Sequence, residues 1–344
     1  MSEVDTLDEA KLAGYLEANI TEFQGPLTAS KFAGGQSNPT FKIEAASGSY
    51  VLRRQPPGKL LKSAHAVDRE YRVLAALADT DVPVAKVYHL CEDPEVIGSM
   101  FYIMEFCDGN VHWSSALEEI PSNEGRAKMY DEMNRVLAAI HSVDLEKVGL
   151  ADYGRPGNYF QRQVDRWSAQ YKASELTPIP EMDKVMAWLA DNIPDDDGKV
   201  SLVHGDYRLD NLMFDKSNQE VIAVLDWELS TLGHPYADLA YQCMGLRLPS
   251  GKADGSSSGL AGLDPAVLGI PSETEYVNRY CERMGIDRIA NWSFYMAFSF
   301  FRLAAICQGV AKRAADGNAS SKSASGVAGM VEPLAVNALG SISE

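Results

Sequence analysis

The side chains best suited to chemistry lie in one short segment, residues 202–228. This segment contains His204, Asp206 and Asn211 in the spacing His-x-Asp-x4-Asn, and Asp226 follows Asp206 by 20 residues. Short apolar runs flank the first three side chains, and a third apolar run ends directly at Asp226. A polar loop after one strand and a carboxylate after the next strand can converge on a single point.

This set of side chains fits the requirements of phosphoryl transfer. One carboxylate can accept or orient the proton of a substrate hydroxyl, while an asparagine and a second carboxylate hold magnesium ions. These groups are hard oxygen donors, which suit Mg²⁺ rather than zinc. Each residue also has a purely structural interpretation, with His204 as a core histidine, Asn211 as a turn residue and Asp226 as a helix cap. Their combined order, downstream of a β-rich region, favours the catalytic interpretation.

The elements that must position these residues divide the chain into a β-rich part and a later, mainly helical part. Apolar alternation and turn residues predict strands at 30–32, 40–45, 50–54, 87–91 and 100–106. Helical periodicity predicts helices at 5–22, 66–78, 126–141, 159–172, 183–192, 274–284 and 292–314. The segment 201–228 forms a short β-rich island within the helical part. This change of character predicts two lobes joined by a hinge near residues 104–110.

Composition and charge argue against several classes of protein. The chain has 344 residues, of which 46% are hydrophobic and 23% charged, as in soluble globular proteins. Its 31 basic and 48 acidic side chains give a net charge of −17, which argues against binding to nucleic acid. The five cysteines are scattered and no pair has CxxC spacing, so neither a disulfide framework nor a zinc site is expected.

Two further features bear on the cellular location. No apolar run approaches the roughly 20 residues that are needed to cross a bilayer, so no membrane association is expected. The N-terminus is acidic and lacks the basic and then apolar layout of a secretion signal. A cytoplasmic location is therefore expected.

The HGD…N loop at 204–211 resembles the catalytic loop of the aminoglycoside phosphotransferase and choline kinase-like superfamily. The resemblance is closest to the branch that includes the kinase domain of acyl-CoA dehydrogenase family members 10 and 11. It rests on GGQSNPTF, YVLRR followed by PPG, SAHAVDREYRVL and HGDYRLDNLMF. It implies a protein-kinase-like, two-lobed α+β fold, with a small β-rich nucleotide-binding lobe at 1–106. A larger, mainly helical lobe at 107–344 would carry catalysis and acceptor binding.

The same resemblance implies roles for individual residues of the loop. Asp206 would be the catalytic base, and Asn211 and Asp226 would bind Mg²⁺. Arg208, two residues after the base, would stabilise the transferring phosphoryl group, with a surface arginine as the alternative. Asp238 would support the loop from the segment that follows.

The loop has two further polar side chains with less direct roles. His204 would brace the loop rather than perform chemistry. Asp210 is either a second acid behind the site or a solvated turn residue, and the sequence leaves both readings open.

The N-terminal part contains candidates for ATP binding. Between two predicted strands, backbone N–H groups and the small side chains of Ser37 and Asn38 could cover the phosphates. Without the downstream HGD…N motif, a plain β-turn would be the better explanation of this segment. Kinases need a cation at the end of the third strand, and a carboxylate from a helix holds this cation in place. Glu70 is the natural carboxylate. The resemblance places Arg53 at the position of the usual lysine. It leaves open whether Arg53 or the adjacent Arg54 forms the pair.

The adenine and acceptor sites are less defined by sequence. Glu105 and Phe106 follow a strongly apolar strand and resemble the hinge whose backbone binds adenine, while a buried strand end is an equally simple reading. Arg162 and Arg166 lie one helical turn apart with aromatic residues nearby. This pair could grip an anionic acceptor such as the phosphates of an acyl-CoA, or could lie on a solvated surface.

Three functions compete on this evidence. The first is a kinase, dependent on Mg²⁺ with ATP as co-substrate, that phosphorylates a hydroxyl of a small-molecule acceptor such as a hydroxyacyl-CoA. The second is a kinase of aminoglycosides or choline-like amino alcohols, which the acidic composition would suit. The third is a pseudokinase that binds a nucleotide or a partner without catalysis, against which the intact Asp206, Asn211 and Asp226 argue.

Overall fold

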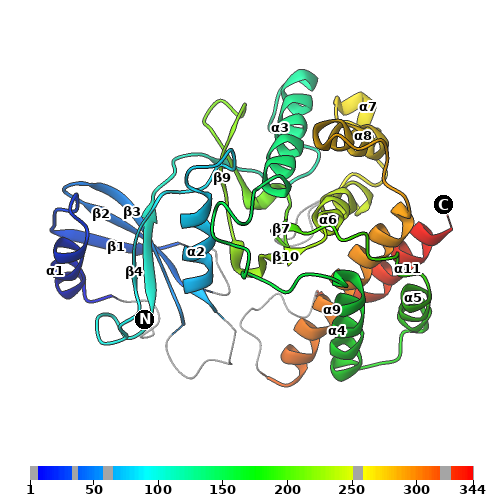
Figure 1. Cartoon of the computed structure of the whole chain (residues 1–344), viewed down its shortest axis with the longest axis horizontal. Coiled ribbons are helices and arrows are strands. Elements are labelled where there is room, and N and C mark those ends of the chain that lie inside the picture. The colour runs from blue at the N-terminus through cyan, green and yellow to red at the C-terminus, as the bar shows by residue number, and fades with distance from the viewer. Residues whose placement is uncertain (1–6, 33–37, 57–64, 251–258, 318–326, 344) are drawn as a thin grey trace.

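The first part of the chain forms an antiparallel sheet with the strand order β1-β2-β3-β5-β4. The computed structural model describes residues 7–32, 38–56, 65–250, 259–317 and 327–343. The strands of the sheet are β1 (Leu27–Lys31), β2 (Thr40–Ala45), β3 (Gly48–Arg54), β4 (Val87–Cys91) and β5 (Phe101–Glu105). Figure 1 shows this sheet at one end of the molecule and the helices of the later part at the other.

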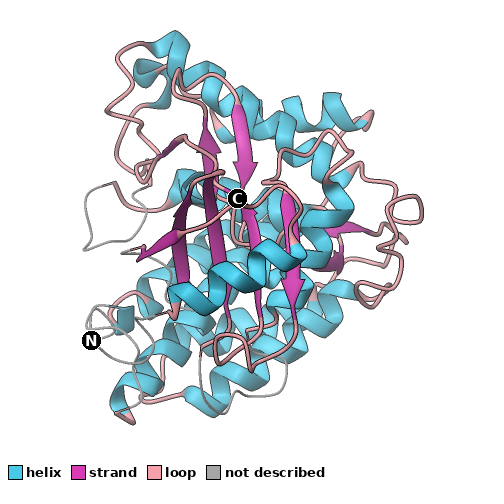
Figure 2. Ribbon diagram, turned by 90° about the vertical axis from the view of Figure 1, so that its left-hand side faces the viewer, coloured by secondary structure: helices cyan, strands magenta, loops and turns pink. Residues whose placement is uncertain are grey.

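Two helices cover the opposite faces of this sheet, α1 (Glu9–Asn19) and α2 (Val67–Leu77). Successive strand residues alternate between the faces, as the pleat of a strand requires. Phe101 and Ile103 of β5 therefore pack into the core with α1, whereas Tyr102 between them packs with α2. Figure 2 shows the strands side by side, with a helix lying across the face nearest the viewer.

The second part of the chain is mainly helical and surrounds one large hydrophobic core. Its helices are α3 (Asn123–His141), α4 (Tyr159–Ser174), α5 (Pro180–Asp191), α6 (Tyr236–Arg247), α7 (Pro265–Leu268), α8 (Glu273–Met284), α9 (Trp292–Ala315) and α11 (Val331–Ile342). Helix α9 packs against α4, α5, α6 and α11, and is the central helix of this lobe.

Helix α9 is 24 residues long and apolar enough, by length and composition alone, to cross a membrane. Of its most apolar stretch, 83% is buried inside the fold, as in the core helix of a globular protein. The sequence of this helix is not one uninterrupted apolar run, because Arg302 and small polar residues such as Ser299 lie within it.

The β-rich island forms two small sheets at the junction of the lobes. β6 (Asn110–Val111), β8 (Leu212–Phe214) and β9 (Val221–Val224) form one antiparallel sheet in the order β6-β8-β9. β7 (Ser201–Val203) pairs with β10 (Thr231–Gly233), a strand beyond the expected end of the island. The loop that links β7 to β8 and the residues after β9 carry the predicted chemistry.

Most predicted elements are present, and their ends differ by a few residues. The third helix begins at Asn123 rather than at residue 126, because the Ser122 side chain accepts a hydrogen bond from the Gly125 N–H and caps it. Helices α6 and α11 were not predicted. Every residue of α6 from Tyr236 to Met244 is buried, so the polar face that would reveal a helical period is missing.

Candidate active site

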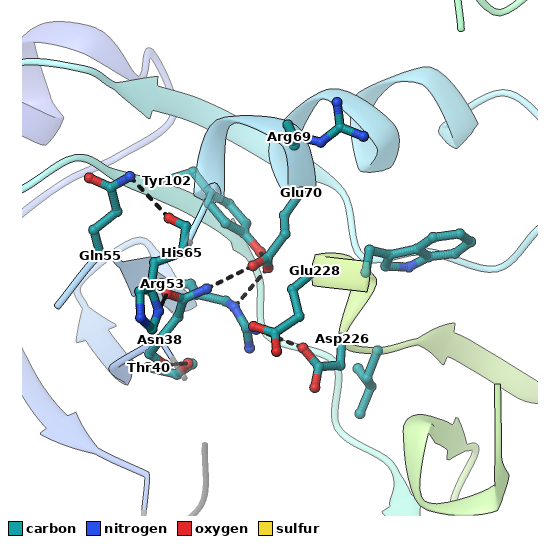
Figure 3. A network of polar contacts seen from close by, with 12 residues as sticks. Asn38, Thr40, Arg53, Gln55, His65, Arg69, Glu70, Tyr102, Asp226 and Glu228 are labelled. Atoms are coloured by element: carbon teal, nitrogen blue, oxygen red, sulfur yellow. Dashed lines mark hydrogen bonds and ion pairs between the residues drawn. The ribbon is translucent and has the colours of Figure 1, made fainter. Parts of the chain in front are cut away.

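Arg53 contacts carboxylates from both lobes. Its Nε lies 2.7 Å from Oε2 of Glu70 on α2, and its Nη2 lies 2.7 Å from Oδ1 of Asp226, just after β9. A third carboxylate, that of Glu228, lies 3.7 Å from the same Nη2. Figure 3 shows these side chains converging on the guanidinium group. The ion pair predicted between strand and helix is therefore present, and it extends to the second lobe.

The alternation of side chains along β3 decides which of two adjacent arginines meets Glu70. Arg53 is paired with Tyr102 of β5, so both side chains project from the face that α2 covers. Arg54 projects from the opposite face, where its Nη1 donates to the carbonyl oxygen of Ile97 at 3.2 Å. Arg53 is therefore the partner of Glu70.

Glu70 is a buried carboxylate that three groups hold in place. Its Oε1 accepts a hydrogen bond from Asn38 Nδ2 at 2.9 Å, and its Oε2 accepts one from the Tyr102 hydroxyl at 3.1 Å. Burial raises the pKa of Glu70 to about 7, even though the neighbouring Arg53 guanidinium acts to lower it. Although burial opposes the charge on Arg53, the nearby carboxylates, Glu70 above all, raise its pKa.

The structure gives Asn38 a different position from the one expected. The residue is fully buried, its Nδ2 donates to Glu70, and its Oδ1 lies 3.0 Å from Nδ1 of His65. An amide that is buried and bonded at both ends cannot reach a nucleotide phosphate. The expected phosphate contact through this side chain is therefore corrected to a positioning role toward Glu70. Ser37 lies outside the described residues.

The residues predicted to bind adenine lie where the chain leaves the N-terminal sheet. The Glu105 N–H donates to the carbonyl oxygen of Lys86 at 2.8 Å, so this N–H is already engaged, and the Glu105 side chain is exposed. Phe106 is half-buried, and its ring centroid lies 4.8 Å from Nζ of Lys42. Glu105 is the last residue of β5 and Phe106 follows it, and their contact with adenine stays a prediction.

Asp206 is held by two neighbouring side chains. Nδ2 of Asn211 donates to the carbonyl oxygen of Asp206 at 2.8 Å and to its Oδ2 at 3.0 Å. The Tyr241 hydroxyl on α6 faces the Asp206 carboxylate, and burial, followed by the charge of this carboxylate, raises the pKa of Tyr241, so the hydroxyl stays protonated. Nε of Arg208 lies 3.6 Å from Oδ1 of Asp206, and its Nη2 forms a 3.0 Å ion pair with Asp210.

The loop that carries Asp206 is anchored by a fully buried carboxylate, Asp238, in the first turn of α6. Oδ2 of Asp238 accepts the His204 N–H at 2.6 Å, and Oδ1 accepts the Gly205 N–H at 2.8 Å. Nε2 of His141 lies 3.5 Å from Oδ2. Burial opposes the ionised form, but these contacts, with His141 the strongest, lower the pKa of Asp238 below its usual value. This geometry matches the predicted supporting role.

The two residues that precede Asp206, His204 and Gly205, explain the shape of the loop. His204 is buried, its Nε2 donates to the Leu225 carbonyl oxygen at 2.8 Å, and its Nδ1 accepts the Asp206 N–H at 3.2 Å. Gly205 has a φ of +85°, and an added Cβ would lie 2.7 Å from the Leu229 carbonyl oxygen. Only glycine therefore fits between His204 and Asp206.

The two predicted metal ligands lie next to each other because β8 and β9 are paired. The backbone N–H of Leu225 donates to the carbonyl oxygen of Asn211 at 2.8 Å, which brings Asn211 beside the residue preceding Asp226. The Asn211 N–H groups are directed at Asp206, so its amide oxygen remains an acceptor. The Asp226 side chain is 38% exposed. An amide oxygen and an exposed carboxylate are a donor set that suits Mg²⁺.

A pocket of about 200 Å³ adjoins the catalytic loop. Arg208 and Asp210 lie at a polar end of the pocket, and the 3.0 Å ion pair between them compensates the charge of Asp210, the one acidic side chain among the described lining residues. The remaining lining is mostly apolar and comes from α6, α9 and the C-terminal segment. It comprises Ser115, Leu209, Tyr241, Gln242, Met244, Gly245, Leu248, Gly259, Leu303, Cys307, Val327 and Met330.

The structure does not bring the predicted arginine pair of α4 to this pocket. Arg162 donates to the carbonyl oxygens of Arg155, at 2.6 Å, and of Pro156, and it lines a separate cavity of about 770 Å³. This cavity and the pocket beside the catalytic loop have no lining residue in common. Arg166 is exposed, and its guanidinium lies 5.3 Å from the ring of Trp167.

Three residues of the site were not found by sequence reasoning. Tyr241 lies in α6, the helix that shows no helical periodicity. Glu228 follows the last strand of the island, and no role was predicted for it. Arg302 donates to the carbonyl oxygen of Gly205 from the middle of α9. An arginine in the middle of a long apolar stretch is an unusual feature, and this signal could have identified Arg302.

The comparison with family models matches residues 28–262 to the phosphotransferase enzyme family. Acyl-CoA dehydrogenase family member 10 of Mus musculus is 47% identical over 327 residues, which are 95% of this chain and 30% of that protein. The chain therefore spans about a third of the length of this relative. A candidate aminoglycoside phosphotransferase from Ralstonia eutropha is 49% identical, with a TM-score of 0.89 over 98% of both chains.

More distant solved structures share the fold. Choline kinase from Cryptosporidium parvum is 11% identical with a TM-score of 0.68, over 98% of this chain and 96% of that chain. Aminoglycoside phosphotransferase APH(4)-Ia, in a complex with AMP-PNP and hygromycin B, is 16% identical with a TM-score of 0.61. The match covers 96% of this chain and 98% of that chain. With the β-rich and helical lobes described above, these likenesses show a protein-kinase-like fold.

We expect Asp238→Asn to destabilise the protein, because Asn cannot accept both loop N–H groups and leaves one buried donor unsatisfied. The expected loss in the free energy of unfolding is about 1–3 kcal/mol, measured by urea denaturation near neutral pH. Asp144→Asn is the matched control, because Asp144 is exposed and accepts only the Lys147 N–H. Equal stability of the two variants would contradict the anchoring role.

Proposed function

Since the chain belongs to the phosphotransferase enzyme family and is a small-molecule phosphotransferase, we propose that it transfers the γ-phosphoryl group of ATP to a hydroxyl of an acyl-CoA. The pocket beside the catalytic loop carries this proposal, because its lining is mostly apolar. An acyl chain can bury apolar surface there, with its hydroxyl directed toward Asp206. The match to part of an acyl-CoA dehydrogenase family member supports the same acceptor class.

In this mechanism Asp206 accepts the proton of the acceptor hydroxyl as its oxygen attacks the γ-phosphorus. A new oxygen–phosphorus bond forms, the bond to the bridging oxygen of ADP breaks, and the phosphorylated acceptor and ADP leave. Asn211 holds the Asp206 carboxylate in place for this step, and Tyr241 lies next to the same carboxylate. Arg208 lies on the same side of the loop, where its positive charge can stabilise the transferring group.

Asn211 and Asp226 would hold Mg²⁺, which would neutralise charge that develops on the phosphates. Arg53 already contacts Oδ1 of Asp226 at 2.7 Å, so it shares this carboxylate with the proposed metal site. Arg53 is held by Glu70 as well, at 2.7 Å, and is thereby kept close to where the α- and β-phosphates of a nucleotide would lie. Arginine can reach two carboxylates at once because its planar group has donors on two edges.

The alternative acceptor is an aminoglycoside or a choline-like amino alcohol, which the name of the Ralstonia eutropha relative suggests. Such acceptors are cationic and would favour a pocket with uncompensated acidic side chains. Asp210 is the one acidic residue among the described lining of the pocket, and Arg208 compensates its charge. The charge of this pocket therefore favours an acyl acceptor over a cationic one.

We expect the purified protein to consume ATP, with Mg²⁺, in the presence of hydroxyacyl-CoAs and not of aminoglycosides or choline-like alcohols. Asp206→Asn should lower the turnover number at least about 100-fold, the usual contribution of a general base. The phosphorylated product is measured by mass spectrometry, and retained Mg-ADP binding shows that the variant is folded. Asp144→Asn is the control and should keep full activity. Turnover with aminoglycosides alone would overturn the acyl-CoA proposal.

Gly245 gives a steric test of the pocket. It lies within α6, and the nearest atom to an added Cβ would be Ser115 Oγ at 3.8 Å, so a larger side chain has room to enter the pocket. We expect Gly245→Leu to lower kcat/KM for the longest accepted acyl chain at least about tenfold and to leave the KM for Mg-ATP unchanged. Gly340→Leu on α11 is the control, because no atom lies within 4 Å of its added Cβ. Unchanged chain-length preference would contradict acyl binding here.

The raised pKa of Glu70 predicts a pH dependence of nucleotide binding. Its pKa is raised to about 7, so Glu70 is ionised above this pH and takes up a proton below it. Protonation removes the ion pair that holds Arg53, and the affinity for Mg-ADP should therefore fall as the pH is lowered from about 8 to about 6. Titration calorimetry at each pH measures the affinity. The Gln side chain of Glu70→Gln is neutral at every pH, so this variant should bind Mg-ADP weakly and with an affinity that does not change over this pH range. The same fall in affinity in this variant would refute the assignment to Glu70.

A further inference from the structure

Arg302 is a buried arginine in the centre of α9, the core helix of the C-terminal lobe. It is 7% exposed, and its neighbours Phe301 and Phe300 are fully buried apolar residues. A guanidinium in such surroundings is costly unless its charge and its donors are satisfied. The contacts that satisfy Arg302 lead to the catalytic loop.

The first contact of Arg302 fixes the peptide group between Gly205 and Asp206. Nη2 of Arg302 donates to the Gly205 carbonyl oxygen, on one side of this peptide group. The Asp206 N–H, on the other side, donates to Nδ1 of His204 at 3.2 Å. The preceding N–H, that of Gly205, donates to Asp238 at 2.8 Å. Arg302 is therefore the group that engages the carbonyl end of this peptide.

The second set of contacts joins the guanidinium to two aromatic rings. The carbon of this group lies 5.2 Å from the ring centroid of Tyr241 and 5.7 Å from that of Trp167. Both distances are within the range of cation–π attraction. The Tyr241 residue in turn lies next to the Asp206 carboxylate, whose charge adds to the effect of burial in raising the pKa of Tyr241. Arg302 thus acts on Asp206 by two routes, through its backbone and through the side chain of Tyr241.

We propose that Arg302 is a positioning residue that sets the orientation of the Asp206 carboxylate, by holding the Gly205 carbonyl and the ring of Tyr241. The proposal rests on the proposed role of Asp206 as the base. Three elements distant in sequence, α4 with Trp167, α6 with Tyr241 and α9 with Arg302, meet at the Arg302 guanidinium behind the catalytic loop. Gly205 can be held in this way because its φ of +85° turns its carbonyl toward α9, and its N–H toward Asp238.

This role has a kinetic signature that a simple packing role lacks. The nucleotide-binding groups Arg53, Glu70 and Asp226 make no contact with Arg302 among the described residues, so nucleotide binding should not depend on it. Loss of the Arg302 contacts should leave the nucleotide affinity intact and slow the chemical step. A packing residue would instead lower the melting temperature and disturb all functions together.

The test compares Arg302→Met with Arg126→Met. Both arginines donate to backbone carbonyl oxygens in the helical lobe, but Arg126 does so at Ile120 and Leu268, away from the catalytic loop. Hydrogen exchange of residues 201–214, measured by mass spectrometry, should be faster only in Arg302→Met. The turnover number should fall at least about tenfold in this variant, with unchanged Mg-ADP affinity and little change in melting temperature. Arg302→Lys retains a donor and should restore part of the turnover.

A second pair of variants isolates the Tyr241 route. Tyr241→Phe removes the hydroxyl that faces Asp206 and keeps the ring that Arg302 contacts. Tyr130→Phe is the control, because it removes a buried hydroxyl that donates to the Ser115 carbonyl oxygen at 2.7 Å. Only Tyr241→Phe should lower the turnover number, by several-fold, with the KM for Mg-ATP unchanged.

The outcomes separate this proposal from the choice of acceptor. Hydrogen exchange needs no acceptor, so a faster loop in Arg302→Met supports the positioning role even if no hydroxyacyl-CoA is phosphorylated. An unchanged loop would overturn the proposal even if such an acceptor is found. A fall in melting temperature with faster exchange throughout the helical lobe would assign Arg302 to packing and would also overturn it.

Discussion

Arg53 contacts Glu70 on α2 with one edge of its guanidinium and Asp226 after β9 with another. The length of this one group sets the separation between the helix of the N-terminal lobe and the proposed metal-binding loop of the C-terminal lobe. Asn38 and Tyr102 hold Glu70 from behind, so the pair does not depend on two exposed and mobile side chains. A nucleotide that enters between the lobes meets a cation that is already in position.

The catalytic loop shows a second constraint, the burial of charge. Asp238 and Arg302 are both buried, and each forms hydrogen bonds with the backbone of the same loop. Buried charges are stable only when they are paired and hydrogen-bonded. The cost of burying these groups is therefore coupled to the shape of the loop, and the orientation of Asp206 follows from the core rather than from the surface.

The residues proposed for catalysis come from one contiguous segment, whereas the residues that line the adjoining pocket come from several elements. The residues proposed for catalysis and for binding the metal lie within one segment, between Asp206 and Asp226. The pocket beside them is lined from several elements, including α6 near Gly245, α9 near Leu303 and the C-terminal segment near Met330. Variation in those helices can change the acceptor without altering the loop that transfers the phosphoryl group.

The sequence alone indicated the class of reaction, phosphoryl transfer, because its candidate side chains lie at fixed spacing within one short segment. It also indicated the two-lobed fold through its periodicity. Only the tertiary structure decided that Arg53, and not Arg54, meets Glu70, since the answer depends on which face of the sheet α2 covers. It also moved Asn38 into the core, separated Arg162 from the catalytic pocket and brought Arg302 to the catalytic loop. Such contacts join residues far apart in the chain, and no local pattern records them.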